Sequence, residues 1–178
     1  MSILRQLVVK PKLAADSWSL LKSETESENG RQLFPDSLIM ADQLKIQVKN
    51  SFAEIPAANE AASLWLAEKQ SSPAIDYLAN LAIEELVTNC IKYGYDDADE
   101  HTITIELELV ENELKLTVID DGHRFNPLEL TPPDINLPVE DRPVGGLGIH
   151  LLRKMSDRME YARVEAKNHL TLWKRGSV

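Results

Sequence analysis

Apolar and polar residues alternate most clearly in the segment from Thr102 to Val110. Its aliphatic side chains occupy every second position, and threonines and glutamates fill the positions between them. Successive side chains of a strand point to opposite faces of a sheet, so the pattern predicts a strand with one buried face. The segment ELKLTVID, residues 113–120, repeats the alternation after a turn that begins at Glu111, which predicts an antiparallel hairpin.

Three shorter segments alternate in the same way and predict further strands. They are LKIQVKN from Leu44, MEYARV from Met159, and HLTLWKR from His169. A turn at residues 165–167 joins the last two, so we expect the chain to close on the edge of a sheet.

Apolar residues spaced three and four positions apart predict helices in three other places. The first helix runs from Pro56 to Glu68. The second runs from Ala74 to Lys92, with Ser72 as its N-cap and Gly94 after its end. The third begins at a glycine cluster, and its apolar positions are Leu147, Leu151, Leu152, Met155 and Met159.

A long connection, His123 to Val144, precedes that glycine cluster. It is rich in proline, and its apolar residues follow neither the helical nor the strand period. It is also too long for an ordinary connection, so we interpret it as a lid or a disordered loop. It leads into Gly145, Gly146 and Gly148. Glycines let a phosphate approach backbone N–H groups, and the positive end of a helix dipole favours an anion there. A flexible hinge is the alternative interpretation of these glycines.

Asp120 continues the buried face of the strand at 113–120, because it has the same parity as Leu114, Leu116 and Val118. A carboxylate is costly to bury unless a hydrogen-bond donor faces it, and a ligand could supply that donor. The alternative is that Asp120 lies in solvent past the strand end or caps the turn that follows it.

Glu85, Asn89 and Lys92 project from one stripe of the longest predicted helix. An acid, an amide and an amine on one stripe suit a proton acceptor, a ligand for a hard cation such as magnesium, and a counter-charge for phosphate. A solvated helix face, on which Glu84 or Glu85 pairs with a nearby lysine, is the alternative.

Composition narrows these readings. With 178 residues and 43% apolar side chains, the chain has the size of one globular domain. Cys90 is the single cysteine and the four histidines are scattered, which excludes a disulfide framework and a cysteine-based zinc cluster. A net charge of -10 argues against nonspecific nucleic-acid binding. We found no signal peptide and no stretch of membrane-spanning length, so we expect a cytoplasmic protein that does not enter a membrane.

Three segments in order, EELVTNCIKYGY at 84–95, VIDDGHRFNP at 118–127 and RPVGGLGIHLLRKMSD at 142–157, resemble the N, G1 and G2 boxes of the GHKL ATPases. The resemblance covers about Leu44 to Arg175 and is strongest to the serine kinases that act as bacterial anti-sigma factors. It implies an α/β fold, a two-layer sandwich of the Bergerat type. In that fold three helices lie on one face of a mixed, mostly antiparallel sheet, and ATP binds between the helices and the lid.

The resemblance also implies roles at the base end of such a site. Asp120 would accept a hydrogen bond from the adenine amino group, and Gly122 would let the backbone approach the base. Thr171, on the last strand, would support Asp120 through a water molecule.

At the phosphate end, the resemblance makes Glu85 the general base that orients the attacking hydroxyl. Asn89 would be the Mg²⁺ ligand that binds the triphosphate through the metal, and Lys92 would offset phosphate charge. The glycines that would wrap the phosphates are Gly145, Gly146 and Gly148.

The implied function is a serine/threonine protein kinase that uses ATP and Mg²⁺ in a partner-switching system. Such a protein holds a sigma factor or another regulator and phosphorylates a small antagonist protein. The alternative is a non-catalytic regulator whose nucleotide sets the shape of a protein-binding lid. Arg124 departs from the family pattern, standing where many G1 boxes have a second glycine. Residues 1–43 form an appended segment without a motif, for which we consider docking on the 44–178 domain or homodimerisation.

Overall fold

The computed structural model describes residues 42–129 and 147–176. Its strands are β1 (Asp42–Lys49), β2 (Thr102–Val110), β3 (Glu113–Asp120), β4 (Arg158–Val164) and β5 (Lys167–Arg175). Its α-helices are α2 (Ile55–Glu68), α3 (Pro73–Tyr93) and α4 (Leu147–Met155). Two short 3₁₀ helices, η1 (Phe52–Glu54) and η2 (Pro127–Glu129), complete the described elements.

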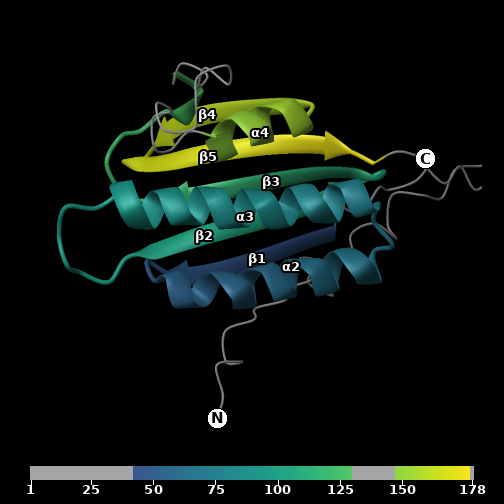
Figure 1. The fold of residues 1–178 in the computed structure, drawn as a ribbon, viewed down its shortest axis with the longest axis horizontal. Helices are drawn as coiled ribbons and strands as arrows, with labels where there is room; N and C mark the ends of the chain where they lie inside the picture. Colours follow the sequence, from purple (N-terminus) through teal and green to yellow (C-terminus); the bar gives the residue numbers. More distant parts are fainter. Residues whose placement is uncertain (1–41, 130–146, 177–178) are drawn as a thin grey trace, which may run out of the picture.

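The strands form one sheet in the order β1-β2-β3-β5-β4. The three helices lie along one face of this sheet, with α3 in the middle, α2 over the β1 side and α4 over the β4 and β5 side (Figure 1). The expected two-layer α/β sandwich is therefore confirmed. Every pairing between the described strands is antiparallel, where the expectation was a mixed, mostly antiparallel sheet.

The core lies between the two layers, and the alternation in the sequence explains it. Ile105, Leu107 and Leu116 are at most 1% exposed, and they face the helices. From the other side α3 contributes Leu78 and Ala82, which are also fully buried. Burial of this aliphatic face supplies most of the driving force for closing the helix layer onto the sheet.

The helix α3 begins and ends where the sequence predicts. The Ser72 side chain accepts a hydrogen bond from the Ile75 N–H at 3.4 Å, which satisfies one of the unpaired donors of the first turn. Pro73 occupies the first helical position. At the other end the Gly94 N–H donates to the Cys90 carbonyl at 2.8 Å. This hydrogen bond ends the helix at Gly94, whose carbonyl contacts the segment that follows β3.

Two tight turns shape the sheet. Glu111 and Asn112 join β2 to β3, and Glu165 and Ala166 join β4 to β5. All four residues have positive φ, between 47° and 64°. Two-residue hairpins with positive φ at both central positions match the twist of the strands they connect. Alanine adopts this conformation at a cost, because its Cβ approaches the backbone.

Parts of the sequence interpretation fall outside the described residues. Asp42 and Gln43 begin β1, and the rest of the expected appended segment, 1–41, is not described. The expected lid is described only as far as Glu129, and Gly145 and Gly146 also lie outside the described ranges. Within 42–129 and 147–176, no helix has both the length and the apolar character needed to cross a membrane.

Candidate functional site

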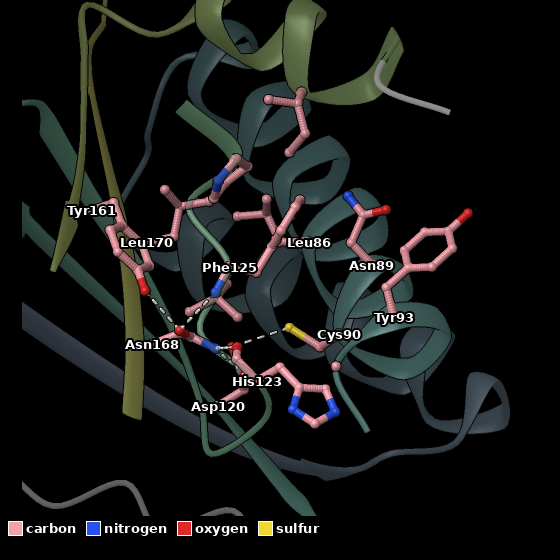
Figure 2. A pocket seen from close by; sticks show the side chains of 14 residues that line it. Leu86, Asn89, Cys90, Tyr93, Asp120, His123, Phe125, Tyr161, Asn168 and Leu170 are labelled. Carbon is pink, nitrogen blue, oxygen red and sulfur yellow. Dashed lines mark hydrogen bonds between the residues drawn. The ribbon is translucent and has the colours of Figure 1, made fainter. Parts of the chain in front are cut away.

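A hollow opens at the edge of the core, where the C-terminal half of α3 faces the ends of β3 and β5 (Figure 2). The turn after β3 and the start of α4 complete its wall. Its lining is mainly apolar and aromatic, with few polar groups: Leu86, Asn89, Cys90, Tyr93, Gly94, Val118, Asp120, His123, Phe125, Pro127, Ile149, Tyr161, Asn168 and Leu170. An apolar wall with a few convergent polar groups is typical of a small-molecule site.

Asp120 supplies the buried charge of this hollow and is 7% exposed. Its Oδ1 atom accepts two hydrogen bonds at 2.9 Å, from the Gly122 N–H and from Asn168 Nδ2. The bond from Gly122 caps the turn, as the alternative interpretation of Asp120 expected, but the carboxylate lies in the wall and not in solvent. One oxygen atom is therefore occupied by the protein itself.

The second oxygen of Asp120, Oδ2, faces the thiol of Cys90, with 3.4 Å between Sγ and Oδ2. Burial raises the pKa of Cys90 well above its usual value, and the charge of Asp120 raises it further. The thiol therefore stays protonated and is only a weak hydrogen-bond donor. Oδ2 remains available for a stronger donor on a ligand.

Gly122 lies where two backbone segments meet. A Cβ atom at this position would stand 2.5 Å from the Gly94 carbonyl oxygen and 2.9 Å from Asp120 Oδ1. The neighbouring His123 N–H donates to the same Gly94 carbonyl at 2.8 Å. Glycine is required here because the turn after β3 packs directly on the end of α3, which shapes the floor of the hollow.

Asn89 and Glu85 project from α3 one turn apart but meet different neighbours. Asn89 lines the hollow (Figure 2). The carboxyl group of Glu85 lies against Gly148 in the first turn of α4, so closely that a Cβ atom at Gly148 would overlap it. Among the described residues, the wall of the hollow does not include Glu85 or Lys92. Lys92 is exposed in the last turn of α3.

Thr171 does not lie next to Asp120, contrary to our expectation. It pairs with Thr117 on β3, and the two Oγ1 atoms are 3.0 Å apart on the sheet face away from the helices. Asn168 is the residue opposite Asp120 in the register and contacts it directly. The reason is the alternation of side chains along β5. Asn168, Leu170 and Leu172 share the buried face, so Thr171 must point to the other face.

Two exposed aromatic side chains, Tyr93 and Phe125, stand at the hollow (Figure 2). Tyr161 lines it from β4. Aromatic rings contribute large apolar contact area and stack on other planar groups. Together with one buried acceptor, these rings suit a flat heterocycle that carries an amino group.

The connection from α3 to β2 is tied to the end of β3 by His101. Its Nε2 atom lies 2.8 Å from Asp97 Oδ1, and its Nδ1 atom lies 3.2 Å from Asp121 Oδ1. The hydrogen bond to Asp97, followed by the interactions with Asp121, raises the pKa of His101. The ring also stacks on Tyr95, with 4.0 Å between centroids. This cluster holds the segment after Gly94 against the end of β3, beside the floor of the hollow.

The amino-acid sequence matches a known domain family over most of its length. The family model of the histidine kinase-like ATPase domain matches residues 48–174. The chain belongs to this family. Membership confirms the resemblance noted in the sequence and makes a nucleotide the ligand to expect in a site of this kind.

Two curated bacterial kinases are similar in sequence to part of this chain. The serine-protein kinase RsbW of Bacillus mycoides is 37% identical over 84 residues, which cover 45% of this chain and 52% of that protein. The serine/threonine-protein kinase BtrW of Bordetella bronchiseptica is 25% identical over 101 residues, covering 57% and 71%. The chain thus spans about half the length of the RsbW protein it matches.

A solved structure supports the fold independently. The crystal structure of the RsbU and RsbW domains of a Mycobacterium tuberculosis protein superposes with a TM-score of 0.56 at 18% identity. The match covers 76% of this chain and 33% of that one. At this level of identity, the likeness concerns the fold alone.

Proposed function

We propose that this histidine kinase-like ATPase domain binds ATP in the hollow and transfers its terminal phosphoryl group to a serine or threonine of a small antagonist protein. The observation that carries the proposal is the state of Asp120, a buried carboxylate. The protein holds one of its oxygens, and the other, among the residues that the structure describes, accepts a hydrogen bond from a thiol alone. The adenine amino group is a donor that fits this acceptor, whereas guanine presents a carbonyl oxygen at the same ring position and would repel it.

The phosphates would extend from the hollow toward the place where α3 meets the first turn of α4. Gly148 lies there, and we propose that Gly145 and Gly146 join it in wrapping the phosphates. Lys92, exposed on the last turn of α3, would offset phosphate charge. Asn89 lines the hollow and would lie between the base and the phosphates.

Magnesium fits this site only together with the nucleotide. Mg²⁺ prefers oxygen ligands and keeps several waters, and Asn89 offers one amide oxygen at the wall of the hollow. Within the described ranges, no cluster of three or more His, Cys, Asp or Glu side chains could hold a metal ion by itself. We therefore propose that Asn89 holds a Mg²⁺ ion that the triphosphate brings. The bound ion would neutralise charge on the phosphate oxygens.

Glu85 is the proposed general base. In the transfer, the substrate hydroxyl oxygen bonds to the γ-phosphorus, the bond from that phosphorus to the bridging oxygen breaks, and ADP leaves. The hydroxyl proton passes to the Glu85 carboxylate. Phosphoryl transfer depends mainly on positioning and charge stabilisation, so one acid beside a phosphate cradle is sufficient.

The names of the relatives support the reaction class, because RsbW is a serine-protein kinase and BtrW is a serine/threonine-protein kinase. By the same resemblance, we propose that the chain acts in the cytoplasm and switches between two partners. One is a sigma factor or another regulator, and the other is an antagonist that is released when phosphorylated. Residues 1–43 would serve docking or dimerisation beside the 44–178 domain.

A nucleotide-gated binding module is the second candidate, and the contact between Glu85 and Gly148 favours it. The Glu85 carboxyl group packs against α4, and the described lining of the hollow does not include it. This position fits a residue that packs two helices together. In such a module, nucleotide binding would change protein affinity without phosphoryl transfer.

Incubation with labelled ATP separates these candidates. The purified chain is mixed with Mg²⁺, γ-labelled ATP and candidate antagonist proteins encoded near its own gene. The kinase proposal expects label on one antagonist, on serine or threonine. Nucleotide-dependent capture of an antagonist without any label would favour the binding module.

A further inference from the structure

Among the described residues of the hollow, Asn168 makes the most side-chain hydrogen bonds, and it is 6% exposed. Its Nδ2 atom donates to Asp120 Oδ1 at 2.9 Å and to the His123 carbonyl at 2.7 Å. Both N–H bonds of the amide are thus used, one on the Asp120 carboxylate and one on the turn that follows it (Figure 2).

The amide oxygen of Asn168 is also saturated. It accepts from the Tyr161 hydroxyl at 2.8 Å and from Arg163 Nη1 at 2.7 Å, and more weakly from the Phe125 N–H at 3.4 Å. A reversed amide would place an N–H group against the Arg163 cation. The surrounding donors therefore hold the amide in one orientation, with nitrogen toward Asp120.

Arg163 extends from the edge strand β4 to the same group of residues. Its Nη1 atom donates to the Gly122 carbonyl at 2.8 Å as well as to Asn168. Gly122 in turn donates its N–H to Asp120 Oδ1. Arg163 therefore braces both of the groups that hold this oxygen, the Asn168 amide and the backbone turn at Gly122.

We propose that Arg163 and Asn168 are positioning residues that set the preference of this site for an adenine base. They keep Asp120 Oδ1 engaged and so present Oδ2 as the acceptor for the amino group of the base. Asn168 acts without a polar contact to the nucleotide, since its polar atoms are occupied within the protein. Arg163 acts through Asn168 and Gly122 and is not among the residues that line the hollow. This inference rests on the proposal that the hollow binds ATP.

If the brace is lost, the carboxylate can rotate and the turn at Gly122 can shift. The bond to the amino group then weakens, whereas contacts to the phosphates, which all nucleoside triphosphates share, remain. A hydrogen bond to a charged group accounts for roughly a tenfold to hundredfold change in affinity. The effect is therefore a loss of base discrimination and not a uniform loss of binding.

Calorimetric titration with ATP and with inosine triphosphate tests this distinction, because inosine carries a carbonyl oxygen in place of the amino group. The unmodified chain should prefer ATP by about tenfold or more. Arg163→Ala should weaken ATP binding by about tenfold and inosine triphosphate binding by less than about twofold. Arg163→Lys, which keeps the charge and a donor, should recover part of the preference.

Arg158→Ala is the matched control. Arg158 lies on the same strand but stacks over Trp173, at 3.7 Å from the ring centroid, and does not line the hollow. Its loss should leave the ratio of the two affinities unchanged. A uniform weakening of both nucleotides by Arg163→Ala, or an unchanged ratio, would overturn the positioning role. If the unmodified chain binds ATP no better than inosine triphosphate, the proposed function itself fails, and the positioning role with it.

Discussion

Asp120 and Asn168 stand opposite each other on neighbouring strands, and a hydrogen bond of 2.9 Å joins Asn168 Nδ2 to Asp120 Oδ1. The contact turns a costly buried carboxylate into a defined acceptor, because it engages one oxygen and leaves the other toward the hollow. In the proposed ATP site, the sheet thus positions the acceptor for the base before any ligand arrives.

Asp120→Asn should weaken ATP binding by about 2 kcal/mol or more, the scale expected for a buried charged hydrogen bond. The new amide removes the negative charge and brings an N–H group toward either Asn168 or the adenine amino group. Isothermal titration calorimetry measures the change. Asp42→Asn is the control and should leave ATP affinity unchanged, since Asp42 is exposed at the start of β1 and lies outside the described wall of the hollow. Equal ATP affinity in Asp120→Asn and the unmodified chain would remove Asp120 from the site.

The His101 cluster makes stability depend on pH. The pKa of His101 is raised above its ordinary value, about 6.5, by Asp97 and then Asp121. A raised pKa means that the charged form is favoured by folding, so this contribution is fully present below about pH 6.5 and is lost as pH rises through the folded pKa. His101→Gln removes the titration but keeps a polar side chain. The melting temperature of the unmodified chain should exceed that of His101→Gln by more at pH 6 than at pH 9. A difference that is the same at both pH values would contradict this role.

Ala166 and Ala162 should respond in opposite ways to the same substitution. Ala166 has φ of 60°, so Ala166→Gly relieves steric strain and should raise the free energy of unfolding by up to about 1 kcal/mol. Ala162 lies within β4, where glycine gains nothing and adds freedom to the unfolded chain, so Ala162→Gly should lower it by roughly 0.5–1 kcal/mol. Chemical denaturation measures both. The same sign for both variants would contradict the turn conformation at Ala166.

Much of the fold was predictable because it follows from local patterns. The strict alternation in β2 and β3 and the Ser72 cap of α3 appear directly in the sequence and reappear in the structure. The buried position of Asp120 was predictable for the same reason, from its parity with Val118.

The partners of Asp120 were not predictable in the same way. Asn168 meets it through the pairing of β3 with β5, which are separated by α4 and β4 in the chain. Arg163 joins through a long side chain whose reach has no periodic signal. Thr171 was a wrong assignment, and the parity of Leu170 and Leu172 already pointed away from it. The contact of Glu85 with Gly148 depends on how α3 and α4 pack, which no local pattern encodes.

The separation of roles between Glu85 and Asn89 tests the kinase proposal most directly. Glu85→Gln keeps the shape and removes the charge, and Asn89→Ala removes the proposed oxygen ligand of the Mg²⁺ that the triphosphate brings. ATP affinity by calorimetry and phosphate transfer to the antagonist from labelled ATP are measured for both variants. We expect Glu85→Gln to bind ATP nearly as well as the unmodified chain but to transfer phosphate roughly a hundredfold more slowly, the usual scale for loss of a general base. Asn89→Ala should instead weaken magnesium-dependent ATP binding. Equal loss of ATP binding in both variants, or undiminished transfer by Glu85→Gln, would contradict the assignment of Glu85 as the base.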